Sequence, residues 1–288
     1  MGNCIYCSKP AGVFSKKHKE CATKFLEEKR RKEQRIISDK NEILSLAATA
    51  AIGQGSIEAV KEKVKSASEF IDELTCKGLL VQAWERAVDI CLGDSILSKE
   101  EETKLRDFLK AFSMTQSDTD QNGAYTKVGQ AAILRDLVEG KVPERVKILG
   151  ALPFNFKKGE KIVWLFKGVQ YYEHKTSSKF VGGSQGVSIR IARGIYYRVG
   201  AFKGQPVQKT ENLHLDTGML AVTDQYLYFA GSTKSFRVPY GKIVTFMPYS
   251  DGIGIQRDAA TAKPQSFIVG DGWFINNLVT NLSRLQAS

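Results

Sequence analysis

Gly218-Met-Leu-Ala-Val-Thr-Asp-Gln-Tyr-Leu-Tyr-Phe229 carries the clearest structural signal in this chain. Its two runs of β-branched and aromatic residues flank the polar pair Asp224-Gln225, which predicts two strands joined by a short turn. Similar short runs predict strands at 161–173, 188–202, 219–223, 226–230, 235–239, 243–247, 253–256 and 265–269. Residues 273–285 then change to a helical period. Working outward from this stretch, we predict a β domain at residues 151–288, a partly open barrel capped by the final helix.

The same stretch resembles the GRAM branch of the pleckstrin-homology-like (PH-like) fold. The likeness lies in residues 218–229, in Lys234-Ser-Phe-Arg-Val-Pro-Tyr240 and in the following Lys242-Ile-Val. It implies a PH-like β-barrel that acts as a binding module, because relatives of this fold bind inositol lipids, anionic membranes or peptides. The whole chain also resembles bacterial cytoplasmic proteins that combine the same kinds of module, a likeness that implies no biochemical role.

Basic residues near the start of the β domain are the binding candidates that this resemblance implies. Lipid-binding relatives place such residues on the first two strands and the loop between them, where this chain has Lys175, Lys179, Arg190 and Arg193. Arg190 and Arg193 are three residues apart, so on one strand they point to opposite faces. We therefore expect diffuse attraction to an anionic membrane surface, or a protein contact, instead of a specific phosphoinositide pocket.

Two pairs of potential metal ligands lie near the N-terminus, in Cys4-Ile-Tyr-Cys7 and His18-Lys-Glu-Cys21. Within each pair two residues separate the ligands, a spacing that lets both side chains reach one tetrahedral ion. A knuckle followed by a ligand pair at the start of a helix resembles a treble-clef zinc finger. Because four protein ligands fill a tetrahedral Zn²⁺ site, the metal is expected to be structural. The alternative is three free thiols and a surface histidine that cluster by chance.

A basic run, Lys29, Arg30, Arg31 and Lys32, follows the expected finger on a strongly helical segment. These residues can contact phosphate groups, as basic helices of nucleic-acid-binding proteins do. Glu27, Glu28 and Glu33 lie within three or four residues of them, which also suits a solvated, salt-bridged helix surface. We favour the solvated surface.

The net charge of +11 on the 288 residues is unevenly distributed. Residues 1–40 carry 11 Lys and Arg against 5 Asp and Glu, residues 41–150 carry 14 against 18, and residues 151–288 carry 17 against 8. Residues 41–150 also follow a helical period. We predict an α+β protein of three parts: a zinc finger with a basic helix (1–40), an acidic all-α domain (41–150) and the β domain (151–288). The two basic parts, residues 1–40 and 151–288, are expected to attract polyanions.

Asp118-Thr-Asp-Gln-Asn-Gly123 begins like a calcium-binding loop of the EF-hand type. The twelfth position of such a loop needs a bidentate Glu, but this chain has Gly129 there. The pattern favours a polar turn between two helices over a calcium site.

No nucleophile elbow, metalloprotease, dinucleotide-binding or kinase motif is present in the sequence. We therefore expect a non-enzymatic adaptor, stabilised by zinc, whose PH-like domain docks on an anionic membrane surface or a protein partner. The alternative is a nucleic-acid-binding protein that uses the finger and residues 29–35. No run approaches the ~18 apolar residues that span a bilayer, so the expected location is cytoplasmic, with peripheral membrane association.

Overall fold

The computed structural model describes residues 2–11, 15–93, 96–146, 148, 150–174, 187–192, 195–199, 212–259 and 261–287. For residues 174, 187–192, 195–199 and 212, only the backbone is described. The chain is an α+β protein that divides into two compact units, residues 1–128 and 129–288.

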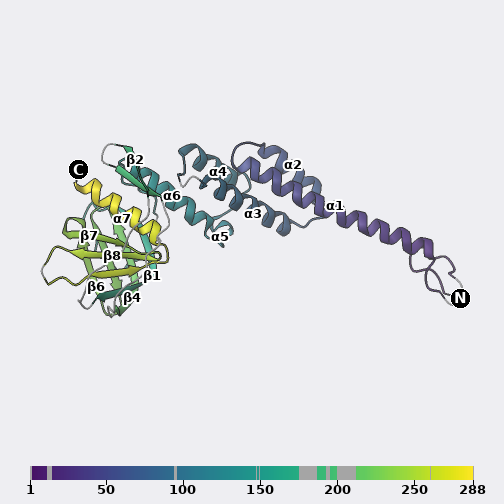
Figure 1. Cartoon of the computed structure of the whole chain (residues 1–288). Helices are drawn as coiled ribbons and strands as arrows, with labels where there is room; N and C mark the ends of the chain where they lie inside the picture. The colour runs from purple at the N-terminus through teal and green to yellow at the C-terminus, as the bar shows by residue number, and fades with distance from the viewer. Residues whose placement is uncertain are drawn as a thin grey trace. The chain divides into compact units, whose positions relative to one another are not determined.

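The first unit is helical (Figure 1). Its helices are α1 (Lys19–Ala51), α2 (Ile57–Ala67), α3 (Glu73–Cys91), α4 (Lys99–Ala111) and α5 (Gln116–Thr119), and α6 (Ala124–Val138) begins there. Side chains at their N-termini accept hydrogen bonds from free backbone N–H groups, as in the capping box of Ser98 and Glu101. The apolar faces enclose Trp84, whose indole N–H donates to the carbonyl of Leu105 at 3.0 Å and so joins α3 to α4.

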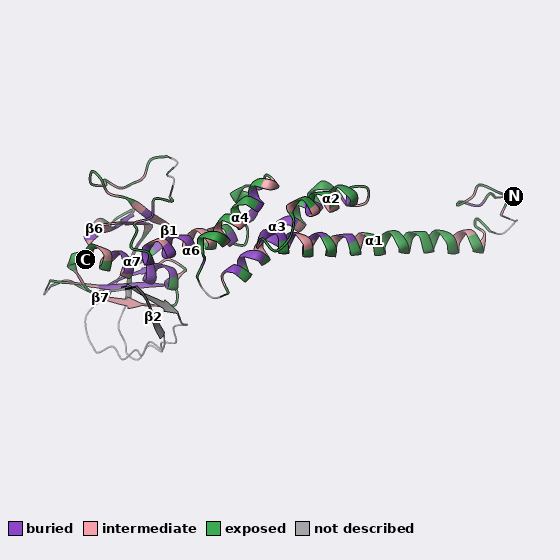
Figure 2. Ribbon diagram, turned by 90° about the horizontal axis from the view of Figure 1, so that it is seen from above, coloured by how far each residue is buried: buried purple, intermediate pink, exposed green. Residues whose placement is uncertain are grey.

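Helix α1 has two halves with different surroundings (Figure 2). Its second half contributes Ile43 and Ala47 to the core of the helical unit. Residues 23–35 are exposed on every face of the helix. The helix runs through residue 40, so the expected finger and the helical region share one continuous element.

The second unit contains a seven-stranded antiparallel sheet in the order β6-β5-β4-β1-β9-β8-β7. Its strands are β1 (Ile162–His174), β4 (Asn212–Thr223), β5 (Tyr226–Gly231), β6 (Ser235–Pro239), β7 (Ile243–Pro248), β8 (Gly252–Arg257) and β9 (Gln265–Ile268). A second, two-stranded sheet consists of β2 (Val187–Ala192) and β3 (Ile195–Val199). The short helix η1 (Tyr240–Lys242) and helix α7 (Gly272–Ala287) complete the unit.

The prediction of a PH-like β-barrel capped by a helix is wrong in one respect, because the seven-stranded sheet is open. Its edge strands β6 and β7 are consecutive in the chain, but within the described residues they pair only with β5 and β8. Pro239 ends β6 and Pro248 ends β7. Proline has no N–H to donate to a neighbouring strand, which discourages pairing at these positions.

One hydrophobic core holds the second unit together. It combines Leu134 and Leu137 of α6, strand residues such as Phe229, and Phe274 and Leu278 of α7. The end of α6 therefore packs with the sheet, although its helical period had placed it with residues 41–150. The expected boundaries at residues 40 and 150 both fall inside the two compact units.

Most strands that the sequence predicts lie where expected, including 235–239 and 226–230. The prediction of one strand at 188–202 is wrong, because β2 and β3 are separate antiparallel strands. Among the described residues, no helix combines the length and the apolar character needed to cross a membrane.

Candidate metal centre

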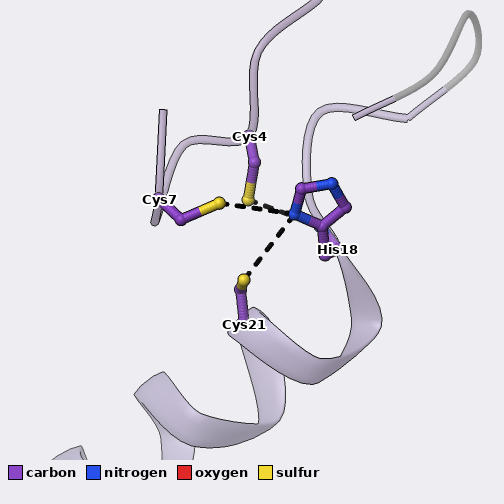
Figure 3. Close-up of side chains that lie close together, drawn as sticks. All are labelled: Cys4, Cys7, His18 and Cys21. Carbon is purple, nitrogen blue, oxygen red and sulfur yellow. Dashed lines mark hydrogen bonds between the residues drawn. The ribbon is translucent and has the colours of Figure 1, made fainter. Parts of the chain in front are cut away.

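The N-terminal knuckle is shaped by backbone hydrogen bonds between residues that are close in the sequence. The N–H of Cys4 donates to the carbonyl of Lys9 at 2.7 Å, and the N–H of Ser8 donates to the carbonyl of Cys4 at 2.8 Å. Ser8 has a φ of 58°, the left-handed backbone conformation that tight turns use. This turn brings the side chains of Cys4 and Cys7 to the same side of the chain (Figure 3).

Helix α1 supplies the other two side chains. His18 is the residue immediately before the helix, and Cys21 lies three residues later in its first turn. The side chain of an N-cap residue lies close to that of the third residue of the helix, as in a capping box. The N–H of His18 also points at the Cys4 sulfur, 3.4 Å away, and so links the helix start to the knuckle.

Cys4, Cys7, His18 and Cys21 converge on one point (Figure 3). The Nδ1 atom of His18 lies 3.4 Å from Sγ of Cys7 and 3.6 Å from Sγ of Cys21. All four potential ligand atoms lie within 4.8 Å of one another. In a tetrahedral zinc site, bonds of about 2.0–2.3 Å place the ligand atoms roughly 3.3–3.8 Å apart. The side chains are thus arranged so that they could hold a metal ion.

The imidazole of His18 is oriented by a second contact. Its Nε2 lies 3.0 Å from the carbonyl oxygen of Pro10. Because a carbonyl oxygen only accepts, Nε2 carries the proton, and in a neutral ring Nδ1 is left to bind a metal. Histidine ligands commonly make such a hydrogen bond through their other nitrogen, which fixes the ring orientation.

The three thiols influence one another electrostatically. Burial raises the pKa of Cys4, but hydrogen bonds from backbone N–H groups, led by that of His18, outweigh it and lower this pKa to about 6. Hydrogen bonding to Cys7, burial and the negative charge of the other two sulfurs raise the pKa of Cys21 to about 11. The hydrogen bond to Pro10 is the main reason why the pKa of His18 is raised. A bound cation would offset the repulsion between the thiolates.

The basic run after the finger lies on the exposed half of α1 and does not join the metal cluster. Lys29 makes an exposed ion pair with Glu33 at 3.9 Å. Such pairs contribute little to stability. Lys175, Lys179 and Arg193 lie outside the described residues, and Arg190 is on β2, where only the backbone is described.

The calcium-like loop has other contacts. Asp118 forms an ion pair with Lys77 at 2.7 Å, and Asp120 accepts hydrogen bonds from Thr126 at 2.7 and 2.9 Å. The Cys/His group is the one potential metal cluster among the described residues. These contacts agree with the interpretation of the loop as a helix–helix turn.

Two contacts around the candidate metal centre escaped the sequence analysis, namely the hydrogen bond from His18 to Pro10 and the contact between Tyr6 and Phe25. The rings of Tyr6 and Phe25 lie with their centroids 4.8 Å apart, so the knuckle packs on α1. Placing Phe25 on the helical surface that carries Cys21, four residues earlier, could have indicated this contact.

No protein-family model matches this chain, and a search of curated proteins finds no match. What the centre can do is therefore argued from its own geometry. If all four side chains bound a tetrahedral ion, no position would be left for a substrate or water, which would favour a structural role.

Proposed function

We propose that this chain is a non-enzymatic adaptor, with a finger that folds around one structural zinc ion and a PH-like C-terminal module that docks on an anionic membrane surface or a protein partner. The convergence of Cys4, Cys7, His18 and Cys21 carries this proposal. The proposal also draws on the resemblance of the chain to bacterial cytoplasmic proteins that combine the same kinds of module.

Zinc is the metal that this set of ligands favours. Three thiolates and one imidazole in a tetrahedral arrangement are typical of structural zinc sites. A bound zinc ion supplies folding energy to a small unit with almost no hydrophobic core. Among the described residues 2–11 and 15–35, Cys4 is the one that is buried. The treble-clef interpretation is supported by the knuckle, the helix start and the position of the ligands on both.

The PH-like interpretation of the second unit is supported by the order of its elements. From β4 to β6, and from β7 to β9, each strand pairs with the next in the chain, and β1 joins the two groups. Helix α7 follows the last strand and packs into the core, as the capping helix of the resemblance does. An open sheet with this connection pattern is compatible with a module that binds instead of catalysing.

Metal analysis tests the first half of the proposal. Untagged full-length protein, purified without chelator, should contain one zinc per chain. Cys7→Ser should lose the metal, whereas Cys76→Ala, a change at a buried cysteine of α3 outside the cluster, should retain it. A folded finger without metal, or with a different metal at one equivalent, would contradict the zinc assignment.

Vesicle co-sedimentation of the full chain tests the second half. We expect binding to vesicles that contain phosphatidylserine, and weaker binding of Lys175→Glu than of the control Lys242→Glu. The control residue is an exposed lysine of η1. If the wild-type protein binds neutral vesicles as well as those with phosphatidylserine, or binds neither, docking on an anionic membrane is excluded. A protein partner would then have to be identified by crosslinking.

Nucleic-acid binding is the second candidate function. The observation that supports it is the exposure of four consecutive basic residues on α1: Lys29, Arg30, Arg31 and Lys32. Consecutive residues turn by about 100° around a helix, so these four charges surround α1 instead of lining one face. This arrangement is less suited to a groove of duplex DNA. Affinity for oligonucleotides that falls steeply with salt, and is lost on charge reversal at these positions, would favour the alternative.

A further inference from the structure

The finger carries an exposed apolar surface in addition to its metal cluster. Ile5 and Tyr6, the residues between the two knuckle cysteines, are 66% and 37% exposed, and Phe25 and Leu26 of α1 are 46% and 53% exposed. The ring contact between Tyr6 and Phe25 joins the knuckle to the helix, and Ile5 and Leu26 are their chain neighbours. We call these four residues the apolar tip.

Such a surface is unusual on a unit of this size. Single exposed apolar side chains are common on soluble proteins, but large ones that gather together usually mark a binding site. The metal cluster does not need them, because the metal ligands come from Cys4, Cys7, His18 and Cys21. Their exposure therefore calls for a partner.

Lysines surround the apolar tip. The N–H of Ile5 donates to the carbonyl of Lys16 at 3.0 Å, which places Lys16 and Lys17 beside the knuckle. Lys9 belongs to the knuckle itself, since its carbonyl accepts from the N–H of Cys4, and Lys19 and Lys24 are on the first turns of α1. All five lysines are exposed. Residues 1–35 carry ten Lys and Arg against four Asp and Glu.

The chemistry of this surface favours a lipid bilayer over nucleic acid. Nucleobases stack on aromatic rings, but the aliphatic side chains of Ile5 and Leu26 offer no ring, and the rings of Tyr6 and Phe25 already contact each other. Aliphatic and aromatic groups enter the interface of a membrane, where nearby lysines attract anionic headgroups without a shaped pocket. The five lysines outnumber the exposed carboxylates nearby, those of Glu20, Glu27 and Glu28, and lysine is a compact point charge suited to such diffuse attraction.

We propose that the apolar tip and its surrounding lysines form a membrane-contact site, which inserts Ile5, Tyr6, Phe25 and Leu26 into the interface of an anionic lipid surface. This site lies in the finger and goes beyond the docking module proposed in residues 151–288. It rests on the proposed metal-stabilised finger, because that fold holds the knuckle against α1.

Co-sedimentation of the full-length, zinc-loaded protein tests the site, with vesicles of phosphatidylcholine alone and of phosphatidylcholine mixed with phosphatidylserine. We expect binding to the mixed vesicles, and a loss of about tenfold in the partition coefficient for Leu26→Ser and again for Ile5→Ser. Leu26→Phe, which keeps a large apolar side chain at this position, should bind the mixed vesicles like wild type. The matched control is Leu74→Ser on α3, at a leucine that is 81% exposed.

Zinc content and the C-terminal variant separate this inference from the proposed function. If Leu26→Ser keeps its zinc and still binds like wild type while Lys175→Glu does not, the finger site is wrong and the docking module stands. If the wild-type protein contains no zinc, and Leu26→Ser still weakens binding to the vesicles, the zinc assignment fails and the membrane-contact site is supported. Two results would overturn the membrane-contact site. The first is that the wild-type protein does not bind the mixed vesicles. The second is that Leu26→Ser loses binding to an oligonucleotide but keeps its binding to the vesicles.

Discussion

At the scale of single residues, Asp216 is the side chain on which the turn between β5 and β6 depends. Its carboxylate accepts from the backbone N–H groups of Ser232, Thr233 and Lys234 at 3.2, 2.7 and 2.7 Å, and from two hydroxyls of the same turn. A Cβ on Gly231 would lie 2.4 Å from this carboxylate, which explains the glycine. The N–H of Thr233, followed by the other donors, holds the pKa of Asp216 well below its usual range despite burial.

We predict that Asp216→Asn lowers the melting temperature of the second unit by several degrees, because in either orientation the amide NH₂ would face backbone N–H groups, which cannot accept a hydrogen bond. The control Asp258→Asn changes an exposed carboxylate and should have little effect. A thermal melt followed by circular dichroism compares the two variants, and equal melting temperatures would contradict the role assigned to Asp216.

The lowered pKa also fixes the direction of a pH effect. A carboxyl group with a depressed pKa in the folded state stabilises the protein above its unfolded pKa of about 3.9, and this contribution is lost as the pH falls further. The difference in melting temperature between wild type and Asp216→Asn should therefore be full at neutral pH and shrink below about pH 4.

At the scale of elements, α1 runs from the candidate metal centre at its start into the core of the helical unit. Contacts with the rest of the helical unit begin at Arg35, whose guanidinium lies 4.5 Å from the ring centroid of Phe70. They become buried at Asp39, which pairs with Lys63 of α2 at 2.7 Å. Before it, residues 23–35 are exposed (Figure 2). An isolated helix of this length is marginal in water, so its anchors at the two ends decide its stability.

We predict that removing the metal with a chelator makes the amides of residues 22–35 exchange at close to unfolded rates, whereas those of residues 43–51 stay protected. A metal held by His18 and Cys21 would fix the start of the helix, and without it only the far end of the segment would be held. Hydrogen exchange followed by mass spectrometry measures both segments in one sample, with α3 as the internal control. Unchanged protection of residues 22–35 would show that the helix does not need the finger.

At the scale of the whole molecule, the two units have separate cores. Phe274 of α7 is fully buried, and its ring centroid lies 5.1 Å from that of Trp164 and 5.9 Å from that of Phe166, both on β1. It therefore fastens the last helix to the sheet.

We predict that Phe274→Ala lowers the free energy of unfolding of the second unit by about 3–5 kcal/mol. The helices α1, α2 and α3 should keep their amide protection, because their buried residues belong to the first unit. Phe274→Leu is the milder control. Hydrogen exchange in both units reads the result, and an equal loss of protection in α3 would mean that the chain unfolds as one cooperative body.

Local patterns were enough to predict the metal cluster and most strands. The four candidate metal ligands lie within residues 4–21, where turn geometry and the helix start alone bring them together. Strands such as Tyr226–Gly231 are short apolar and aromatic runs with their own turn signals at the ends. The basic residues 175, 179 and 193 remain predictions, since the described part of the structure does not include them.

The sequence by itself therefore determined the α+β class, the separate helical and strand regions and the candidate metal centre, because each depends on contacts between near neighbours in the chain. Tertiary structure decided that α6 ends in the core of the sheet, that β6 and β7 leave the sheet open, and that Asp216 holds the turn after β5. It also left Ile5, Tyr6, Phe25 and Leu26 exposed beside the metal cluster. These features depend on which distant surfaces meet, and hydrophobic period and residue spacing do not encode that choice locally.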